Sequence, residues 1–298
     1  MNIGIVGTGA LGSLILSFLV KDKNNRLFFI GKNLETIRYI KKNGIRIIGL
    51  KKQYVSPDEI DVVCNTKNTG KLDLVIVCVK SYDTAAAIRK TAPALAENTV
   101  ILTLQNGLYN REIIKKSLPD RFRKNVIAGV VSLGVTAVTP GVVKFAGKGG
   151  IIIGQDKKTT RLFNSAGLKT IVSNNIDSVI WSKLVVNSAV NPLGAILKVR
   201  NGKLPGSEYR GITLEKIVKE SASVAKAKGI RFLYHDPVSQ VNEVCRKTAD
   251  NLNSMLQDVL NQRKTEIEFI NGAIVKEGEK CGIATPFNRM LYNEIKKL

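Results

Sequence analysis

Histidine is almost absent from this chain of 298 residues, which contains only His235. A metal site of the HExxH type requires two histidines on one helical face, so the sequence excludes that site and we predict no bound metal. His235 directly precedes Asp236-Pro237, where a helix is predicted to begin. A cap or surface position is therefore the expected role of His235, and a catalytic acid built on histidine is disfavoured.

Cysteine is also scarce, with four residues that lack CxxC spacing: Cys64, Cys78, Cys245 and Cys281. This spacing favours free thiols, most of them buried, in a reducing compartment. Long hydrophobic runs are missing too, since none reaches the roughly 18 residues that a membrane span requires. The N-terminus enters a strand pattern at once, without a basic leader and cleavage site. We therefore expect a cytoplasmic protein with no membrane partner.

Acidic residues are few, with 24 Asp and Glu against 46 Lys and Arg and a formal net charge of +22. Such an excess raises nucleic acid or an anionic cofactor as a partner. The basic residues form isolated pairs, such as Lys51-Lys52 and Lys115-Lys116, and no nucleic-acid-binding signature accompanies them. We therefore predict a solvated basic surface that attracts small polyanions, and no nucleic-acid partner.

The glycines near the start of the chain form a dinucleotide-binding motif. An apolar strand at residues 1–6 is followed by Gly7-Thr8-Gly9-Ala10-Leu11-Gly12 and a helical run over residues 13–21. In this context Gly7 permits a tight turn, Gly9 admits a pyrophosphate at the helix N-terminus, and Gly12 allows close helix–strand packing. We predict that every residue of the motif binds a dinucleotide. The alternative is a glycine-rich turn without a ligand.

The cofactor's adenine ribose is expected at the end of the second strand, residues 26–30. NAD-specific folds place an Asp or Glu there to hold the ribose 2′-hydroxyl, whereas this chain has Gly31-Lys32. A missing carboxylate and an adjacent cation favour a 2′-phosphate. We therefore predict NADPH/NADP as the cofactor, with NADH less favoured and Lys32 at the phosphate. The alternative is that Lys32 is a solvated loop lysine.

Alternating strand and helix patterns continue to residue 174. Predicted strands include 72–79, 99–104, 126–135, 141–145 and 150–154, and the close spacing of the last three predicts an antiparallel hairpin annexed to the main sheet. After residue 174 nearly every segment is helical, namely 178–191, 213–228, 237–256, 264–281 and 287–298. The predicted fold class is α/β: a Rossmann-like doubly wound sheet over residues 1–174 and an all-helical, substrate-binding domain over residues 175–298. The oligomeric state stays open, with a homodimer as one option.

Lys80 and Asn106 each follow the carboxyl end of a predicted strand. Ligands bind at this rim of open parallel sheets, so both residues are candidates for the site. Each is also explained as a turn residue, and Asn106-Gly107 in particular is common turn chemistry.

The helix predicted over residues 178–191 carries a narrow polar stripe. At about 100° per residue, Lys183, Asn187 and Asn191 fall within an arc of roughly 80°. The rest of the wheel is apolar or small, which predicts a buried helix and a buried stripe. A buried ammonium is costly unless it is paired or faces a cavity, so the stripe indicates a cleft for an oxygen-rich ligand. The alternative is an amphipathic helix with its polar face in water.

Carbonyl reduction is the chemistry that fits these residues. A hydride donor on the first domain requires an acid that protonates the alkoxide formed from the carbonyl. Lys183 is the candidate, because burial would lower its pKa from a reference value of about 10.4. Its charge would also polarise the carbonyl.

A series of sequence blocks resembles one known family. The blocks are Gly7-x-Gly9-x-x-Gly12, Val79-Lys80-Ser81-Tyr82, Gln105-Asn106-Gly107, Trp181-x-Lys183-x-x-x-Asn187-x-x-x-Asn191-Pro192-Leu193, Asn201-Gly202, Ser254-Met255-Leu256-Gln257-Asp258 and Thr265-Glu266-Ile267-x-x-Ile270-Asn271-Gly272. In this order over the whole chain, they resemble the ketopantoate reductases, the 2-dehydropantoate 2-reductases of the pantothenate pathway.

The resemblance implies a role for each residue. It implies hydride transfer from NADPH to C2 of 2-dehydropantoate, giving (R)-pantoate for pantothenate and coenzyme A biosynthesis, with Lys183 as the proton donor. The substrate-binding residues that it implies are Asn106, Lys183, Asn187, Asn191, Asn201, Ser254 and Glu266, the last on the substrate's 4-hydroxyl. Lys80, Asn106 and Glu266 would also border the cofactor. The chain departs from the family at Gly31-Lys32, where many relatives carry an arginine.

Other functions stay open. One is a reductase of another 2-oxo acid, or a 3-hydroxyacid dehydrogenase of the same architecture, and another is a non-catalytic NADPH-sensing protein. The blocks around Ser254 and Glu266 favour the ketopantoate reductases over the first, although both residues alone would pass as solvated helix positions. Lys183 together with two asparagines weighs against the sensor.

Overall fold

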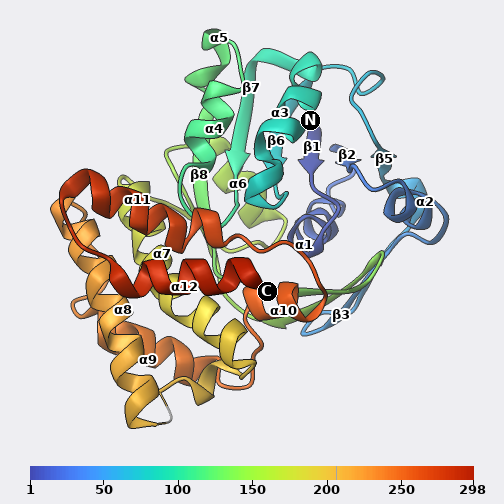
Figure 1. The fold of residues 1–298 in the computed structure, drawn as a ribbon. Helices are drawn as coiled ribbons and strands as arrows, with labels where there is room; N and C mark the ends of the chain where they lie inside the picture. The colour runs from blue at the N-terminus through green and yellow to red at the C-terminus, as the bar shows by residue number, and fades with distance from the viewer. Residues whose placement is uncertain (206) are drawn as a thin grey trace. The chain divides into compact units, whose positions relative to one another are not determined.

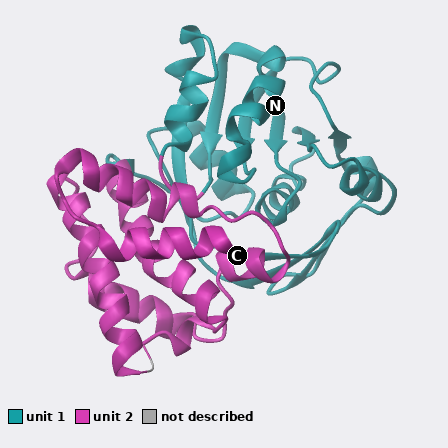
Figure 2. Ribbon diagram, in the orientation of Figure 1, with its two compact units in different colours: residues 1–105, 109–176 teal, residues 106–108, 177–298 magenta. Residues whose placement is uncertain are grey.

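The computed structural model describes residues 1–205 and 207–298. By their internal contacts these residues form two compact units (Figure 2). Unit 1 contains Met1–Gln105 and Tyr109–Ile176, and unit 2 contains Asn106–Leu108 and Asp177–Leu298. The sequence predicts the domain boundary between residues 174 and 175. The short segment Asn106–Leu108 belongs to unit 2 although the residues on both sides of it belong to unit 1.

Unit 1 is built on a sheet with the strand order β12-β11-β8-β7-β6-β1-β2-β5 (Figure 1). Its strands are β1 (Asn2–Val6), β2 (Arg26–Ile30), β5 (Asp61–Val63), β6 (Leu72–Val77), β7 (Leu95–Thr103), β8 (Val126–Val131), β11 (Ile151–Ile153) and β12 (Thr170–Val172). All neighbouring pairs from β5 to β8 are parallel, whereas β11 is antiparallel to β8. The parallel part follows the Rossmann strand order 3-2-1-4-5-6, which confirms the predicted sheet.

Helices cover both faces of this sheet. They are α1 (Ala10–Leu19), α2 (Leu34–Asn43), α3 (Thr84–Thr91), α4 (Asn110–Lys116), α5 (Asp120–Arg123) and α6 (Lys157–Ser165), with the 3-10 turns η1 (Pro57–Glu59), η2 (Ser81–Asp83) and η3 (Ala92–Ala94). Leu74 and Ile76 of β6 pack in one core cluster with residues of α1, α2 and α6. Val75 and Val77 pack in a second cluster with residues of α3, α4 and α5. Because successive side chains of a strand point to opposite faces and both faces are covered, β6 is apolar at every position except the exposed Asp73.

A smaller sheet in unit 1 corrects the predicted hairpin. Its order is β4-β3-β10-β9, with β3 (Ile45–Gly49), β4 (Gln53–Val55), β9 (Gly134–Thr139) and β10 (Val142–Gly147). The single strand predicted at 126–135 is wrong, because it is split into β8 of the main sheet and β9 of the small sheet. The β9–β10 hairpin is therefore not annexed to the main sheet; β11 pairs there instead. The apolar sequence 126–135 has no period that could reveal the break.

Every regular element described in unit 2 is helical, as predicted (Figure 1). The elements are α7 (Ile176–Leu197), η4 (Asn201–Lys203), α8 (Glu208–Ala227), α9 (Pro237–Lys247), α10 (Ser254–Leu260), η5 (Ile267–Phe269), α11 (Asn271–Cys281) and α12 (Pro286–Lys297). The predicted helix 237–256 is broken into α9 and α10, and the predicted helix 264–281 is broken into η5 and α11. Asp236, rather than His235, caps α9 by accepting hydrogen bonds from the backbone of Val238 and Ser239.

The helix α7 runs through Pro192 to Leu197, past its predicted end at Asn191. Proline has no N–H to donate to the carbonyl four residues earlier, which belongs to Ser188. The side-chain Nδ2 of Asn271, on α11, donates to that carbonyl oxygen at 2.8 Å. A side chain thus replaces the missing backbone donor and ties α11 to α7.

By length and composition alone α7 could cross a membrane, but 78% of its most apolar window is buried inside the structure. Its buried residues pack with α8, α9 and α12 in one apolar cluster. This is the burial expected of a core helix.

Candidate functional site

The turn after β1 leaves open space at the N-terminus of α1. Gly7 has a φ of +121°, and a Cβ there would lie 2.7 Å from the backbone carbon of Cys78. A Cβ at Gly12 would collide with the carbonyl oxygen of Gly7. A Cβ at Gly9, the N-cap of α1, would meet no described atom within 4 Å. The turn is therefore tight on its inner side and open where a pyrophosphate would approach the helix, so it fits a dinucleotide.

The other residues of the motif border the same turn. Ala10 and Leu11 form the first turn of α1. Thr8 lies against Gly31, at the end of β2, where a Cβ would come within 2.7 Å of the threonine methyl group. The sequence Gly31-Lys32 is thus placed beside the motif by direct packing.

Two lysines predicted near the cofactor also lie at the ends of strands in unit 1. Lys32 follows β2, and its Nζ lies 2.7 Å from a carboxylate oxygen of Asp83. Lys80 is the N-cap of η2, after β6. The loops after β6 and β7 are joined, because Nε2 of Gln105 donates a hydrogen bond to the carbonyl oxygen of Val79 at 2.9 Å. The structure places both lysines at the carboxyl-end rim of the sheet.

In unit 2, Lys183 on α7 is the residue best suited to acid–base chemistry. Its Nζ donates a hydrogen bond to Oδ1 of Asn106 at 2.8 Å. Burial lowers the pKa of Lys183 to about 8, and the negative charge of Glu266 acts in the opposite direction. Glu266 is itself only 6% exposed. The structure thus brings together Asn106, Lys183 and Glu266, which lie far apart in the sequence.

The Asn106–Leu108 segment is fixed to the turn that carries Glu266. The backbone N–H of Leu108 donates to the carbonyl oxygen of Phe269 in η5 at 2.9 Å, and Glu266 is the N-cap of η5. Gly107 has a φ of +83°, and a Cβ there would collide with the same carbonyl oxygen. Glycine is therefore required for the close approach that holds this segment near the ammonium of α7.

Two carboxamides continue the polar stripe of α7. Asn187 is partly buried and Asn191 is only 5% exposed. Within residues 1–205 and 207–298, neither side chain has a hydrogen-bond partner in the protein. A carboxamide offers both donors and acceptors, so the two side chains suit an oxygen-rich ligand.

The remaining predicted substrate residues lie beside the same helix. Asn201 donates from Nδ2 to Oγ1 of Thr248 at 2.9 Å, and its Oδ1 accepts a hydrogen bond from Asn253 at 3.4 Å. Asn253 also donates to the carbonyl oxygen of Val190, on α7, at 3.1 Å. Ser254, the first residue of α10, is exposed. Through Asn253, both Asn201 and Ser254 are tied to the turn of α7 that carries the second carboxamide.

Asn253 is the main residue that sequence analysis missed. Its Oδ1 accepts a hydrogen bond from the backbone of Leu256 at 3.0 Å, so it caps α10 as well as joining Asn201 to α7. An asparagine before a helix start is a typical N-cap signal. The signal was hidden because the sequence predicts a continuous helix over 237–256.

No group of three or more His, Cys, Asp or Glu in the described part of the chain could hold a metal ion. All four cysteines are free, as predicted. The prediction that most of them are buried is wrong, since only Cys245 is fully buried and Cys64 is exposed. Cys64 directly follows β5, whose last residues lie at the sheet edge, so its thiol reaches solvent.

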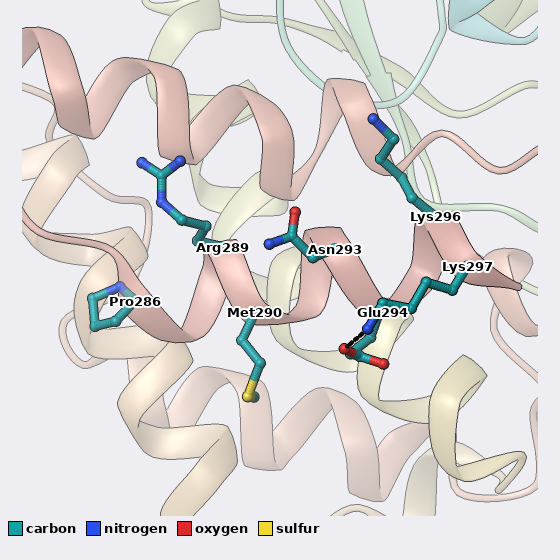
Figure 3. A pocket seen from close by; sticks show the side chains of 7 residues that line it. All are labelled: Pro286, Arg289, Met290, Asn293, Glu294, Lys296 and Lys297. Carbon is teal, nitrogen blue, oxygen red and sulfur yellow. Dashed lines mark hydrogen bonds and ion pairs between the residues drawn. The ribbon is translucent and has the colours of Figure 1, made fainter.

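A surface hollow lies along α12 and is lined by Pro286, Arg289, Met290, Asn293, Glu294, Lys296 and Lys297 (Figure 3). Lys297 and Glu294 form an ion pair of 2.6 Å across one helical turn. The lining comes from a single helix and contains no residue of the predicted site. We assign the hollow no role.

Two family models match the chain. The model described as "Ketopantoate reductase PanE/ApbA" matches residues 3–158, and the model described as "Ketopantoate reductase PanE/ApbA C terminal" matches residues 175–298. The 2-dehydropantoate 2-reductase of Archaeoglobus fulgidus is 35% identical over 305 residues, which cover 99% of this chain and 97% of that protein.

Solved structures share the fold over the full chain. A PanE/ApbA family ketopantoate reductase from Ralstonia eutropha JMP134 has a TM-score of 0.90 at 27% identity and covers 100% of this chain and 98% of its own. A ternary structure of D-mandelate dehydrogenase with NADH and anilino(oxo)acetate has the same TM-score of 0.90 at 27% identity, with coverage of 100% and 97%. The similarity extends over both units.

Proposed function

The chain belongs to the ketopantoate reductase family, and from this premise we propose how its own residues carry out the reaction. The protein is an oxidoreductase that reduces 2-dehydropantoate to pantoate in pantothenate biosynthesis. It uses a nicotinamide cofactor, for which the turn after β1 has the required shape. The observation that carries the residue assignments is the Lys183–Asn106 hydrogen bond beside two carboxamides that lack protein partners.

We assign the cofactor to unit 1. The backbone N–H groups of Gly9 and Ala10 would hold the pyrophosphate, with Thr8 and Leu11 flanking it, and Lys80 would lie nearby. Lys32 would hold a 2′-phosphate, which makes NADPH the preferred cofactor. The absence of an acid at Gly31-Lys32 and the net charge of +22 support this preference. When bound, the cofactor supplies the hydride to C2 of the substrate.

We assign the proton to Lys183. As the alkoxide forms at C2, one N–H bond of the ammonium breaks and the proton passes to the alkoxide oxygen, leaving a neutral amine. A pKa of about 8 makes this transfer easier than from an ordinary lysine. Asn106 accepts one hydrogen bond from the ammonium, which holds the Lys183 side chain in place.

We assign substrate binding to the polar groups around Lys183. The carboxamides of Asn187 and Asn191 would bind the 2-oxo acid group, and Asn201 and Ser254 would contact the substrate beside them. Glu266 would accept a hydrogen bond from the 4-hydroxyl of 2-dehydropantoate. Its burial close to Lys183 supports this role, because the carboxylate belongs to the polar group around the ammonium.

The function is tested by following NADPH consumption with a panel of 2-oxo acids. The panel contains 2-dehydropantoate, its analogue without the 4-hydroxyl, and an aryl 2-oxo acid. We expect the highest kcat/KM for 2-dehydropantoate. A higher value for the aryl acid would instead indicate a 2-hydroxy acid dehydrogenase, and absence of turnover with every acid would contradict an enzymatic role.

The pH dependence of both reaction directions should follow the titration of Lys183. Reduction requires the protonated lysine, so its kcat/KM should fall as pH rises through about 8. Oxidation of pantoate requires the neutral amine, so its rate should rise over the same range. A primary kinetic isotope effect with deuterated cofactor identifies the conditions in which hydride transfer limits the rate. Profiles without opposite slopes in the two directions would contradict Lys183 as the titrating group.

Replacement of Lys32 by Ala should weaken NADPH binding and leave NADH binding nearly unchanged. Because the side chain is exposed and already paired with Asp83, we expect a loss of about 1 kcal/mol or slightly more, roughly five- to tenfold in Kd. Fluorescence titration of both cofactors measures this. Lys158→Ala, which removes an exposed lysine on α6, is the matched control and should change neither Kd. Equal losses for NADPH and NADH would show that Lys32 does not contact the 2′-phosphate.

A further inference from the structure

The ion pair between Lys32 and Asp83 joins two strand ends of unit 1. The Nζ of Lys32 lies 2.7 Å from the carboxylate of Asp83. Lys32 follows β2, and Asp83 is the last residue of η2, which follows β6. In the sheet, β1 lies between β2 and β6, and its carboxyl end carries the glycine motif. The ion pair therefore spans the region in which the cofactor's adenine ribose is expected.

The two partners differ in exposure and in how firmly their backbone is held. The side chain of Lys32 is 68% exposed, whereas that of Asp83 is 24% exposed. The backbone of Asp83 is held, because its N–H donates to the carbonyl oxygen of Lys80 at 2.8 Å. The next residue, Thr84, donates from Oγ1 to the carbonyl oxygen of Ser81 at 2.7 Å. The lysine can therefore leave the aspartate more easily than the aspartate can move away.

Within the described part of the chain, the carboxylate of Asp83 is not used to cap a helix by a hydrogen bond, although the residue stands at the N-cap of α3. Its ion pair with Lys32 is exposed enough that the pair contributes little to stability. The Asp83 carboxylate neutralises the ammonium of Lys32, which is the group proposed to bind a 2′-phosphate.

We infer that Asp83 is a specificity-determining residue that weakens the discrimination between NADPH and NADH. A 2′-phosphate must displace the Asp83 carboxylate from the Lys32 ammonium, and it is also repelled by that carboxylate. A 2′-hydroxyl carries no charge and meets neither penalty. Asp83 therefore raises the Kd of NADPH and leaves that of NADH nearly unchanged. This inference rests on the proposed contact between Lys32 and the 2′-phosphate.

The experiment is a double-mutant cycle on Lys32 and Asp83, read by fluorescence titration of NADPH and NADH at low salt. Asp83→Asn keeps the size and capping ability of the residue and removes its charge. We expect it to tighten NADPH binding about three- to tenfold and to change NADH binding less than twofold. In the Lys32→Ala background, Asp83→Asn should increase NADPH affinity less. The remaining gain would come only from removal of the repulsion between the Asp83 carboxylate and the 2′-phosphate.

Asp61→Asn is the matched control. It breaks the exposed 2.8 Å ion pair between Asp61 and Arg26, at the opposite end of β2, and should change neither Kd. A gain of equal size for both cofactors, no gain for NADPH, or a selective loss of NADH would overturn the inference. The last result would show that Asp83 holds the ribose hydroxyl.

The outcomes separate this inference from the function on which it rests. If Lys32→Ala weakens NADPH selectively and Asp83→Asn has no effect, the phosphate contact stands and the inference fails. If Lys32→Ala affects both cofactors equally, both fail. Because titration requires no turnover, neither result depends on the identity of the 2-oxo acid.

Discussion

Replacement of Lys183 by Ala should lower kcat for 2-dehydropantoate by at least about two orders of magnitude. General acid catalysis typically contributes about 10²–10⁴-fold, and loss of the ammonium's polarisation of the carbonyl adds to this. NADPH binding should stay nearly intact, since the residues proposed to bind the cofactor's phosphates lie in unit 1. Folding should also survive, because truncation removes a partly desolvated charge rather than a packing anchor. Steady-state kinetics, NADPH titration and thermal unfolding measure these three quantities.

Lys183→Arg is the companion variant. It keeps the positive charge and loses the compact, titratable ammonium, so it should restore little activity. Recovery of most of the wild-type rate would mean that charge alone suffices. If Lys183→Ala retained more than about a tenth of the wild-type kcat when chemistry limits the rate, the proton would have to come from water or another residue.

Replacement of Glu266 by Ala should reduce kcat/KM for 2-dehydropantoate by about 100-fold or more. A site built to accept a hydroxyl hydrogen bond discriminates strongly, because its buried polar group is unpaired with the wrong substrate. The 2-oxo acid that lacks the 4-hydroxyl already forgoes this bond and should lose far less. The kcat/KM values of the wild type and Glu266→Ala for these two substrates together give the coupling energy between Glu266 and the 4-hydroxyl.

The same variant has a second signature that a purely structural role would not produce. The negative charge of Glu266 raises the pKa of Lys183, so its removal should lower that pKa further below about 8. The fall in reduction rate should then begin at a lower pH for both substrates. Glu266→Gln, which keeps the size of the side chain, should show the same pH shift. Uniform losses for both substrates with an unchanged pH profile would remove Glu266 from this role.

The dinucleotide motif and the core of the sheet could be predicted from the sequence because local patterns determine them. A strand, a GxGxxG turn and a helix in succession allow few backbone conformations. A nearly continuous apolar strand such as 72–77, in which only Asp73 is polar, must be covered on both faces. The helical character of unit 2 follows from the same kind of periodicity. The positions at which the helices of unit 2 are interrupted could not be predicted in this way. The linker between α9 and α10 ends at Asn253, the N-cap of α10, which is held by a hydrogen bond to α7.

The contacts between distant residues could not be predicted in the same way. The polar stripe of α7 reveals Lys183, but no local pattern indicates that Asn106 and Glu266 surround it. The partner of Lys32 is likewise set by the sheet order, which brings the loops after β2 and β6 to the same rim. Pro192 offers one signal that could have been used, because it leaves the Ser188 carbonyl in need of a donor from another helix.

The membership of Asn106–Leu108 in unit 2 has a consequence for protein engineering. The segment is covalently continuous with β7 on one side and with α4 on the other, while its contacts are made with η5 and α7. A fragment that begins at residue 177 would contain the helices of unit 2 and lack Asn106, which accepts a hydrogen bond from Lys183. In a chimaera that joins two family members at a single crossover near residue 176, Asn106–Leu108 would come from one protein and the helices that it contacts from the other. Exchange of unit 2 between relatives therefore requires that residues 106–108 travel with it.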